Sequence, residues 1–182
     1  MFRKPRFNRP LRRGIVANVP PALRHANRLF ADGQFLDAAT AFEELAHRAE
    51  LRGIPQAAQL YMAAGRCRLE LRQPDLAVQN FKRGLSILAG RGRPIHIQKA
   101  AQHCISDLSK KGYLQEANEI KQMVKEFLPG VEEIEKPETA SPLVHLPAVC
   151  PSCGGTLRSD DVDWIDDNSA ECPWCGSSVM SA

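Results

Sequence analysis

The feature that most constrains this chain lies near its C-terminus, where two Cys-x-x-Cys pairs follow one another. Cys150 and Cys153 form the first pair, Cys172 and Cys175 form the second, and 18 residues separate the two. In each pair a proline follows the first cysteine and a glycine follows the second. Proline fixes φ early in a tight turn, and glycine tolerates the positive φ that lets backbone N–H groups approach sulfur. Two such turns supply four thiolates, the ligand set of a closed tetrahedral Zn²⁺ site.

This stretch resembles the zinc-ribbon family, whose members carry two such turns joined by a short β-hairpin. The resemblance implies one structural zinc ion on the four cysteines and a small β domain over residues 150–182. Two disulfides or a thiol redox pair are the alternatives, and iron is a minor one because rubredoxins use similar turns. No ligand position is left open and no general base lies nearby, so the predicted zinc is structural rather than catalytic.

Strand-like residues between the two cysteine turns fit a small hairpin. We expect strands at residues 156–158, around Val162 and Trp164, and at residues 169–171, with a turn at 166–168. A segment this short buries too little apolar area to fold alone, so metal binding is expected to supply most of its folding free energy.

Residues 20–129 carry a helical pattern throughout. Apolar residues recur at helical spacing in six segments, and glycine or proline separates one segment from the next. The breaks fall at residues 31–34, 53–55, 73–75, 90–92 and 111–112. The sequence therefore predicts a mainly α fold of six helices in three antiparallel pairs.

Similar segments recur within these helix pairs. They are residues 33–38 followed by Phe42, residues 72–77 followed by Phe81, and residues 111–117. Ala38, Ala77 and Ala117 are 39 and 40 residues apart. The segments resemble the turn, small residue and aromatic residue of tetratricopeptide (TPR) repeats, whose period is about 34 residues. The resemblance implies a TPR-like solenoid, and the third pair departs from the pattern with Ile105 and Lys121 at the small and aromatic positions.

TPR solenoids bind proteins in a groove lined by the first helix of each pair. The groove positions that the resemblance implies are Asn27, Gln59, Met62, Arg66, Lys99, Gln102 and Ser106. A solvated face without a partner is the alternative. Some TPR grooves clamp a terminal carboxylate, but Leu23 and Met62 stand at two of the polar positions needed, so that specificity is not expected. In the C-terminal segment, Trp164 and Trp174 are candidate partner anchors or covers for the metal site.

Charge is distributed unevenly along the chain. Residues 1–19 form a basic arm without acids, whose cations are Arg3, Lys4, Arg6, Arg9, Arg12 and Arg13. Phe2 and Phe7 stand among them, as in segments that bind single-stranded nucleic acid, although a solvated tail fits equally. Residues 150–182 have one arginine and six acids, a net charge of −5. A further hypothesis is that the two ends attract each other, with the acidic segment lying across the helices.

Residues 130–149 are rich in proline and glutamate and read as an extended linker, which predicts a C-terminal domain tethered to the helices rather than fused with them. No run of 18 apolar residues and no secretory signal occur, so no membrane span is expected. Cysteines at metal-ligand spacing indicate a reducing compartment, and we expect the cytoplasm.

The function that these patterns favour is a non-enzymatic adaptor that binds protein partners. The alternative is a nucleic-acid-associated protein anchored by the basic arm. Phosphate binding needs several cations, and the arm offers six whereas the C-terminal segment offers only Arg158. An enzyme is not expected, and neither is a small-molecule substrate, because the sequence has no recognisable nucleophile–base pair and no phosphate-binding glycine loop.

Overall fold

The structure is a computed structural model, and it describes residues 19–92, 94–128, 145–159, 162–166 and 168–181. The chain is mainly helical, with a small three-stranded sheet near the C-terminus. Most of the predicted arm and the predicted linker up to residue 144 lie outside the described residues. We call residues 19–128 the helical domain and residues 145–181 the C-terminal lobe.

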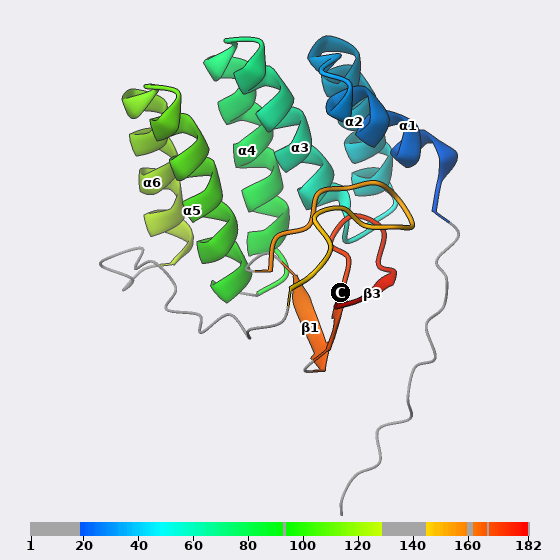
Figure 1. Ribbon diagram of the computed structural model, residues 1–182. Helices are drawn as coiled ribbons and strands as arrows, with labels where there is room; N and C mark the ends of the chain where they lie inside the picture. The colour runs from blue at the N-terminus through cyan, green and yellow to red at the C-terminus, as the bar shows by residue number, and fades with distance from the viewer. Residues whose placement is uncertain (1–18, 93, 129–144, 160–161, 167, 182) are drawn as a thin grey trace, which may run out of the picture.

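Six helices form where the sequence predicts them. Their bounds are α1 (Pro21–Ala31), α2 (Phe35–Leu51), α3 (Ala57–Glu70), α4 (Pro74–Ala89), α5 (Pro94–Lys110) and α6 (Leu114–Phe127). Prolines stand in the first turn of α1 and α4, where the missing N–H costs nothing because it would have no helical partner. Short turns make consecutive helices antiparallel, and they stand side by side in sequence order (Figure 1).

The turn within each helix pair has the same backbone geometry in all three pairs. Its central residue has a positive φ, 76° at Gly33, 56° at Arg72 and 87° at Gly112. The N–H of the next residue then donates to the carbonyl oxygen five residues earlier, at 2.9, 2.9 and 3.0 Å, which ends the first helix. The spacing of these turns, 39 and 40 residues, matches the spacing of the alanines.

Close packing within the pairs explains the small residues. Ala38 and Ala77 are fully buried, and Gly65 of α3 lies directly under the ring of Phe81 on α4. A Cβ atom at Gly65 would lie 2.4 Å from a carbon of that ring. The buried side chains form two clusters, one from α1, α2, α3 and the lobe, and another that extends from α3 to α6.

The lobe contains an antiparallel sheet in the order β1-β2-β3, formed by β1 (Asp163–Asp166), β2 (Ser169–Glu171) and β3 (Ser178–Met180). The turn before β2 is closed by the Asn168 N–H, which donates to Asp166 Oδ1 at 2.9 Å. One predicted strand is absent and one observed strand was not predicted. Residues 156–158 form no strand and only Thr156 bridges to Val149, whereas β3 follows the second cysteine turn and was not predicted.

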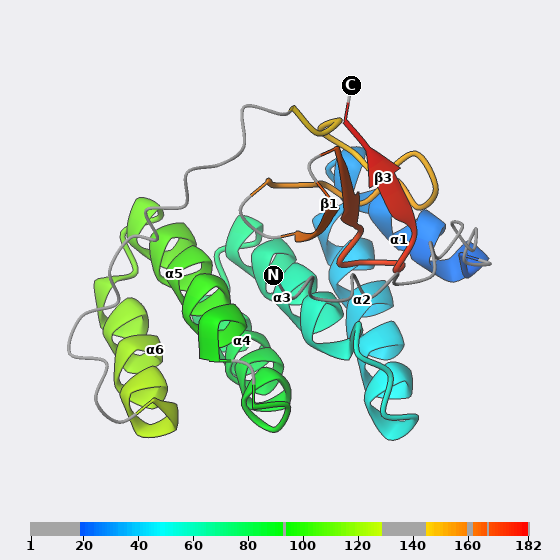
Figure 2. The same cartoon turned by 90° about the horizontal axis from the view of Figure 1, so that it is seen from below.

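The lobe lies against the helical domain, where the sequence predicts a tethered unit. Its buried side chains belong to the same cluster as those of α1, α2 and α3. Figures 1 and 2 show the lobe beside one end of these helices, whereas α6 lies on the far side of the molecule. Within the described residues, no helix has the length and apolar character needed to cross a membrane.

Candidate metal centre

The two cysteine turns have the same local structure. In the first, the Cys150 N–H donates to Gly155 O at 2.8 Å and the Gly154 N–H donates to Cys150 O at 2.8 Å. The second turn repeats both bonds with residues 22 positions later, at 2.9 and 2.9 Å. The glycine after each pair has a positive φ, 75° and 73°, as the sequence predicts. This geometry points the two cysteine side chains of each turn in one direction.

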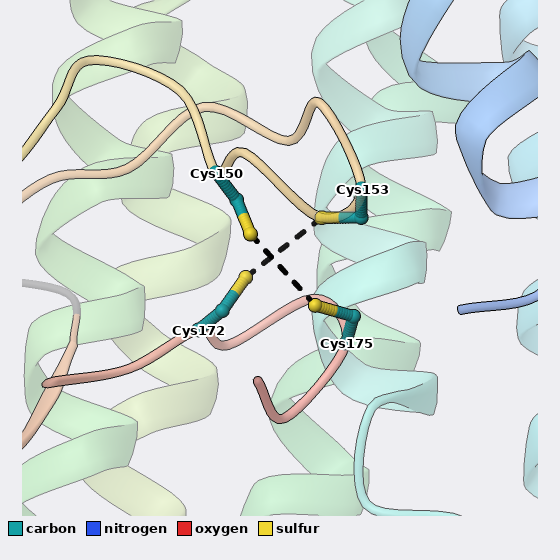
Figure 3. A group of neighbouring side chains, drawn as sticks. All are labelled: Cys150, Cys153, Cys172 and Cys175. Atoms are coloured by element: carbon teal, nitrogen blue, oxygen red, sulfur yellow. Dashed lines mark hydrogen bonds between the residues drawn. The ribbon is translucent and has the colours of Figure 1, made fainter. Parts of the chain in front are cut away.

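All four sulfur atoms face one another across the gap between the turns (Figure 3). Cys150 Sγ is 3.9 Å from Cys175 Sγ, Cys153 Sγ is 3.8 Å from Cys172 Sγ, and all four lie within 4.8 Å of one another. A tetrahedral site with Zn–S bonds of about 2.3 Å has S···S edges of about 3.8 Å. The distances therefore fit four ligands around one ion, and they are far longer than a disulfide bond of about 2.05 Å.

The thiols influence one another's protonation. The hydrogen bond from Cys172, helped by the Gly155 N–H at 3.4 Å, lowers the pKa of Cys153 to about 6. The same sulfur–sulfur contact, together with burial, raises the pKa of Cys172. Burial also raises the pKa of Cys175. Opposed pKa shifts of this kind are expected when buried thiols share protons through hydrogen bonds. A cation bound between the sulfurs can replace these protons and compensate the charge of the thiolates.

Contacts between the lobe and the helical domain concentrate at the two cysteine turns. The buried Asn27 side chain of α1 donates from Nδ2 to Cys153 O at 2.9 Å, across 126 residues of sequence. The indole of Trp174, which stands between Cys172 and Cys175, packs on Phe42 of α2 with ring centroids 5.8 Å apart. Its Nε1–H donates to Thr156 O at 2.8 Å, so the indole also joins the two turns.

An open cavity of about 580 Å³ lies beside the four-cysteine cluster, between α3, α5 and the lobe. Arg91, His96 and Lys99 line its helical side, and Asp163 and Glu171 line the lobe side. His96 Nε2 lies 3.4 Å from Asp163 Oδ1, so one contact already joins the two walls. The cavity is therefore polar and carries opposite charges on its two sides.

The predicted partner residues are divided between several environments. Asn27 binds the lobe, and Gln59, Met62 and Lys99 line the cavity. Arg66 pairs with Asp107 of α5 at 3.4 Å, and Gln102 and Ser106 are partly buried on the same helix. Of the two tryptophans, Trp174 is buried at the metal centre, and Trp164 is half-buried with its Nε1–H donating to Ser159 O. The six cations of the arm lie outside the described residues.

The sequence pattern places Phe42 in a helical repeat and indicates no role for His96 or His103. In the structure all three contact the lobe. Phe42 packs on Trp174 and His96 lies beside Asp163. His103 Nδ1 lies 3.1 Å from Arg158 Nη1. Helical spacing identifies a buried face but not the segment that covers it. The signal used for docking was the opposite charge of the two ends of the chain, and the basic end lies outside the described residues. Comparison of the chain with protein-family models, curated proteins and solved structures finds no match.

Proposed function

We propose that this chain is a non-enzymatic adaptor in which TPR-like helix pairs present a groove to protein partners and one structural Zn²⁺ holds the C-terminal lobe as a zinc ribbon. The observation that carries the metal assignment is the closure of four Sγ atoms at tetrahedral spacing, three of them fully buried. Four thiolates suit a soft or borderline cation, and zinc is the usual occupant of such closed sites. Zinc held there supplies folding free energy and no reactive water.

The thiols also bear on location. All six cysteines are free in the structure. Thiols and thiolate ligands persist where glutathione and thioredoxin maintain a reducing poise. On that ground we place the protein in the cytoplasm.

The zinc assignment is tested by metal content. The purified wild-type chain is expected to contain one zinc per chain by elemental analysis, and Cys172→Ser to contain far less. Cys104→Ala is the matched control, because Cys104 is a buried cysteine of α5 that lies outside the four-sulfur cluster. Iron in place of zinc, or full metal content in Cys172→Ser, would contradict the assignment.

Support for the adaptor role comes from the open cavity. Its walls carry cations on one side and carboxylates on the other, and Gln59 and Met62 on α3 add amide and apolar surface. A peptide that carries both charges and a side chain of moderate size matches this lining, and peptides commonly bind in preformed grooves.

The adaptor role is tested by quantitative affinity purification with charge-reversal variants. Lys99→Glu reverses a cation of the cavity, and Lys110→Glu reverses an exposed cation at the end of the same helix. We expect at least one protein to co-purify with the wild type and with Lys110→Glu but to be depleted from Lys99→Glu. If no protein distinguishes the two variants, the cavity is not the binding groove.

Nucleic-acid association is the second candidate, favoured by the six cations and two phenylalanines of the N-terminal arm. It predicts about micromolar binding to single-stranded or duplex DNA that falls steeply with salt. Fluorescence anisotropy with the full chain and with a chain lacking residues 1–18 tests it. Binding at physiological salt that disappears without the arm would favour this candidate, and its absence would favour the adaptor.

A further inference from the structure

We propose that the helical domain is the receptor for the metal-loaded lobe, so that metal occupancy controls whether the face around Asn27, Phe42 and Gln56 is covered or open to a protein partner. We call these three residues the receptor face. The inference rests on the proposed zinc site and goes beyond it, because it couples that site to a surface on a different part of the chain.

The receptor face contacts parts of the lobe that the metal ligands shape. The Asn27 side chain donates to the carbonyl oxygen of Cys153, whose Sγ is one of the four proposed metal ligands. The Cβ atom of Asn27 also lies close to Gly154. Phe42 packs on Trp174, which lies between Cys172 and Cys175 in the second cysteine turn. Near Gln56 lies Gly176, and a Cβ atom built there would meet Gln56 Nε2 at 3.5 Å. Both cysteine turns must therefore have their native shape for the contacts to form.

The lobe has little of its own to maintain that shape without a metal. Its strands are four, three and three residues long. Besides the cysteines, its buried apolar side chains are Leu157, Val162, Ala170, Trp174 and Val179. A segment with so small a core depends on an additional constraint, which here is one cation on four sulfurs. Removing the cation is expected to leave four thiols at close range and release the turns from the receptor face.

Coupling of this kind is reciprocal. If the metal favours docking, then docking must raise the affinity for the metal by the same factor. Asn27 is thus a positioning residue for the metal centre, although it contributes no ligand. Its side chain is buried and its Nδ2 donates to Cys153 O of the lobe, so docking also determines whether this amide is covered.

Two hydrophobic clusters make the effect local. The cluster that includes α1 and α2 contains the lobe, whereas the cluster that includes α6 contains no lobe residue. Loss of the metal is therefore expected to expose α1 and to leave α6 unchanged. The exposed face would present the Asn27 amide and the Phe42 ring. Trp174 and the Cys153 carbonyl cover them in this structure, so a protein partner with an aromatic side chain next to a free carbonyl would fit the same face.

The test is hydrogen exchange of the full chain, with zinc bound and after chelation, together with zinc affinity by competition with a chromogenic chelator. Chelation is expected to speed amide exchange in α1 by tenfold or more and to leave α6 within twofold. Asn27→Ala is expected to bind one zinc per chain with about tenfold lower affinity, the effect of removing one partner of a buried hydrogen bond. His25→Ala, an exposed change on the same helix, is expected to match the wild type.

The outcomes separate this inference from the zinc assignment. A wild-type chain that binds no zinc overturns the assignment and the inference together. One zinc per chain with exchange of α1 that ignores chelation, or with unchanged affinity in a folded Asn27→Ala variant, overturns the inference alone. Loss of protection in α6 as strong as in α1 also overturns it, because the metal would then stabilise the whole chain rather than one face. Circular dichroism of the variant confirms that its helices are intact.

Discussion

Trp174 of the second cysteine turn lies against Phe42 of α2, with ring centroids 5.8 Å apart and ring planes inclined at 42°. The indole is almost fully buried, and a glycine at position 155 makes room for it, since a Cβ there would lie 2.7 Å from the ring. This contact joins the second cysteine turn to the helical domain through apolar surface rather than through charge alone. It also makes Trp174 part of the core, where the sequence left open whether it was exposed.

Truncation of this tryptophan is therefore expected to be costly. Trp174→Ala should lower the free energy of unfolding of the zinc-loaded chain by about 3–5 kcal/mol, the range for large aromatic residues removed from a core. Trp164→Ala is the matched control, and because Trp164 is half-buried its loss should cost clearly less. Urea unfolding with excess zinc measures both, and equal costs would show that the Phe42 contact contributes little.

Gly65 provides a test of helix packing that does not involve the lobe. A Cβ at this position would lie 2.4 Å from the Phe81 ring, so Gly65→Ala should destabilise the chain by about 1–3 kcal/mol through overpacking. At Gly90 the nearest atoms would be 3.7 Å away, and Gly90→Ala should be neutral or slightly stabilising. Thermal unfolding of the two variants distinguishes them, and a stable Gly65→Ala chain would contradict the packing of α3 on α4.

A polar cross-link fixes α2, α3 and α4 together. Arg68 donates two hydrogen bonds to Glu43, from Nε to Oε1 at 2.9 Å and from Nη2 to Oε2 at 2.7 Å. Asn80 donates to the same carboxylate at 2.9 Å. Burial works to raise the pKa of Glu43, but these donors outweigh it and the pKa is lowered from 4.5. The folded state therefore favours the charged carboxylate.

Stability should follow from this shift with a definite sign. Because the folded pKa lies below the unfolded one, the contribution is complete above about pH 4.5 and is lost as the pH falls through the folded value. Glu43→Gln should cost about 1–3 kcal/mol at pH 7 and progressively less below pH 4.5. Glu44→Gln, at an exposed i,i+4 pair with Arg48, should change stability little at any pH. A cost for Glu43→Gln that stays constant down to pH 3 would contradict the shift.

Cys67 should be chemically inert in the folded protein. It is fully buried in α3, and burial raises its pKa to about 12. At pH 8 only about one molecule in ten thousand would carry the thiolate, which is the form that reacts. Iodoacetamide labelling followed by mass spectrometry should find Cys67 unmodified in the native chain and labelled in urea. Labelling of native Cys67 as fast as that of the lobe cysteines after chelation would contradict its burial.

Local chemistry made most of the helical domain predictable. Glycines and prolines mark the ends of the helices directly, and at Gly33 and Gly112 the positive φ explains why glycine stands there. Arg72 has the same φ without being glycine, so that turn was recognised from its neighbours rather than from its own residue type. The cluster of four cysteines was equally predictable, because the spacing within each turn and the proline and glycine around it determine how two thiols meet.

The docking of the lobe was not predictable from such local patterns. Asn27 and Cys153 are 126 residues apart, and no periodicity links an α1 amide to a carbonyl in a cysteine turn. The sequence predicts Asn27 at a partner-binding groove, and in the structure its side chain donates to the chain's own lobe. The strand β3 was missed because three residues of mixed polarity carry too little signal, and its pairing with β2 depends on the fold of the second turn.

We propose that the four cysteines hold one zinc ion in the gap between the two turns. Zinc K-edge X-ray absorption of the purified full chain measures this most directly, because it reports the element, the ligand type and the bond length together. We expect four sulfur ligands at about 2.3 Å, with no oxygen or nitrogen bound to the zinc. A mixed shell with fewer than four sulfurs, or a chain that carries no zinc, would contradict it.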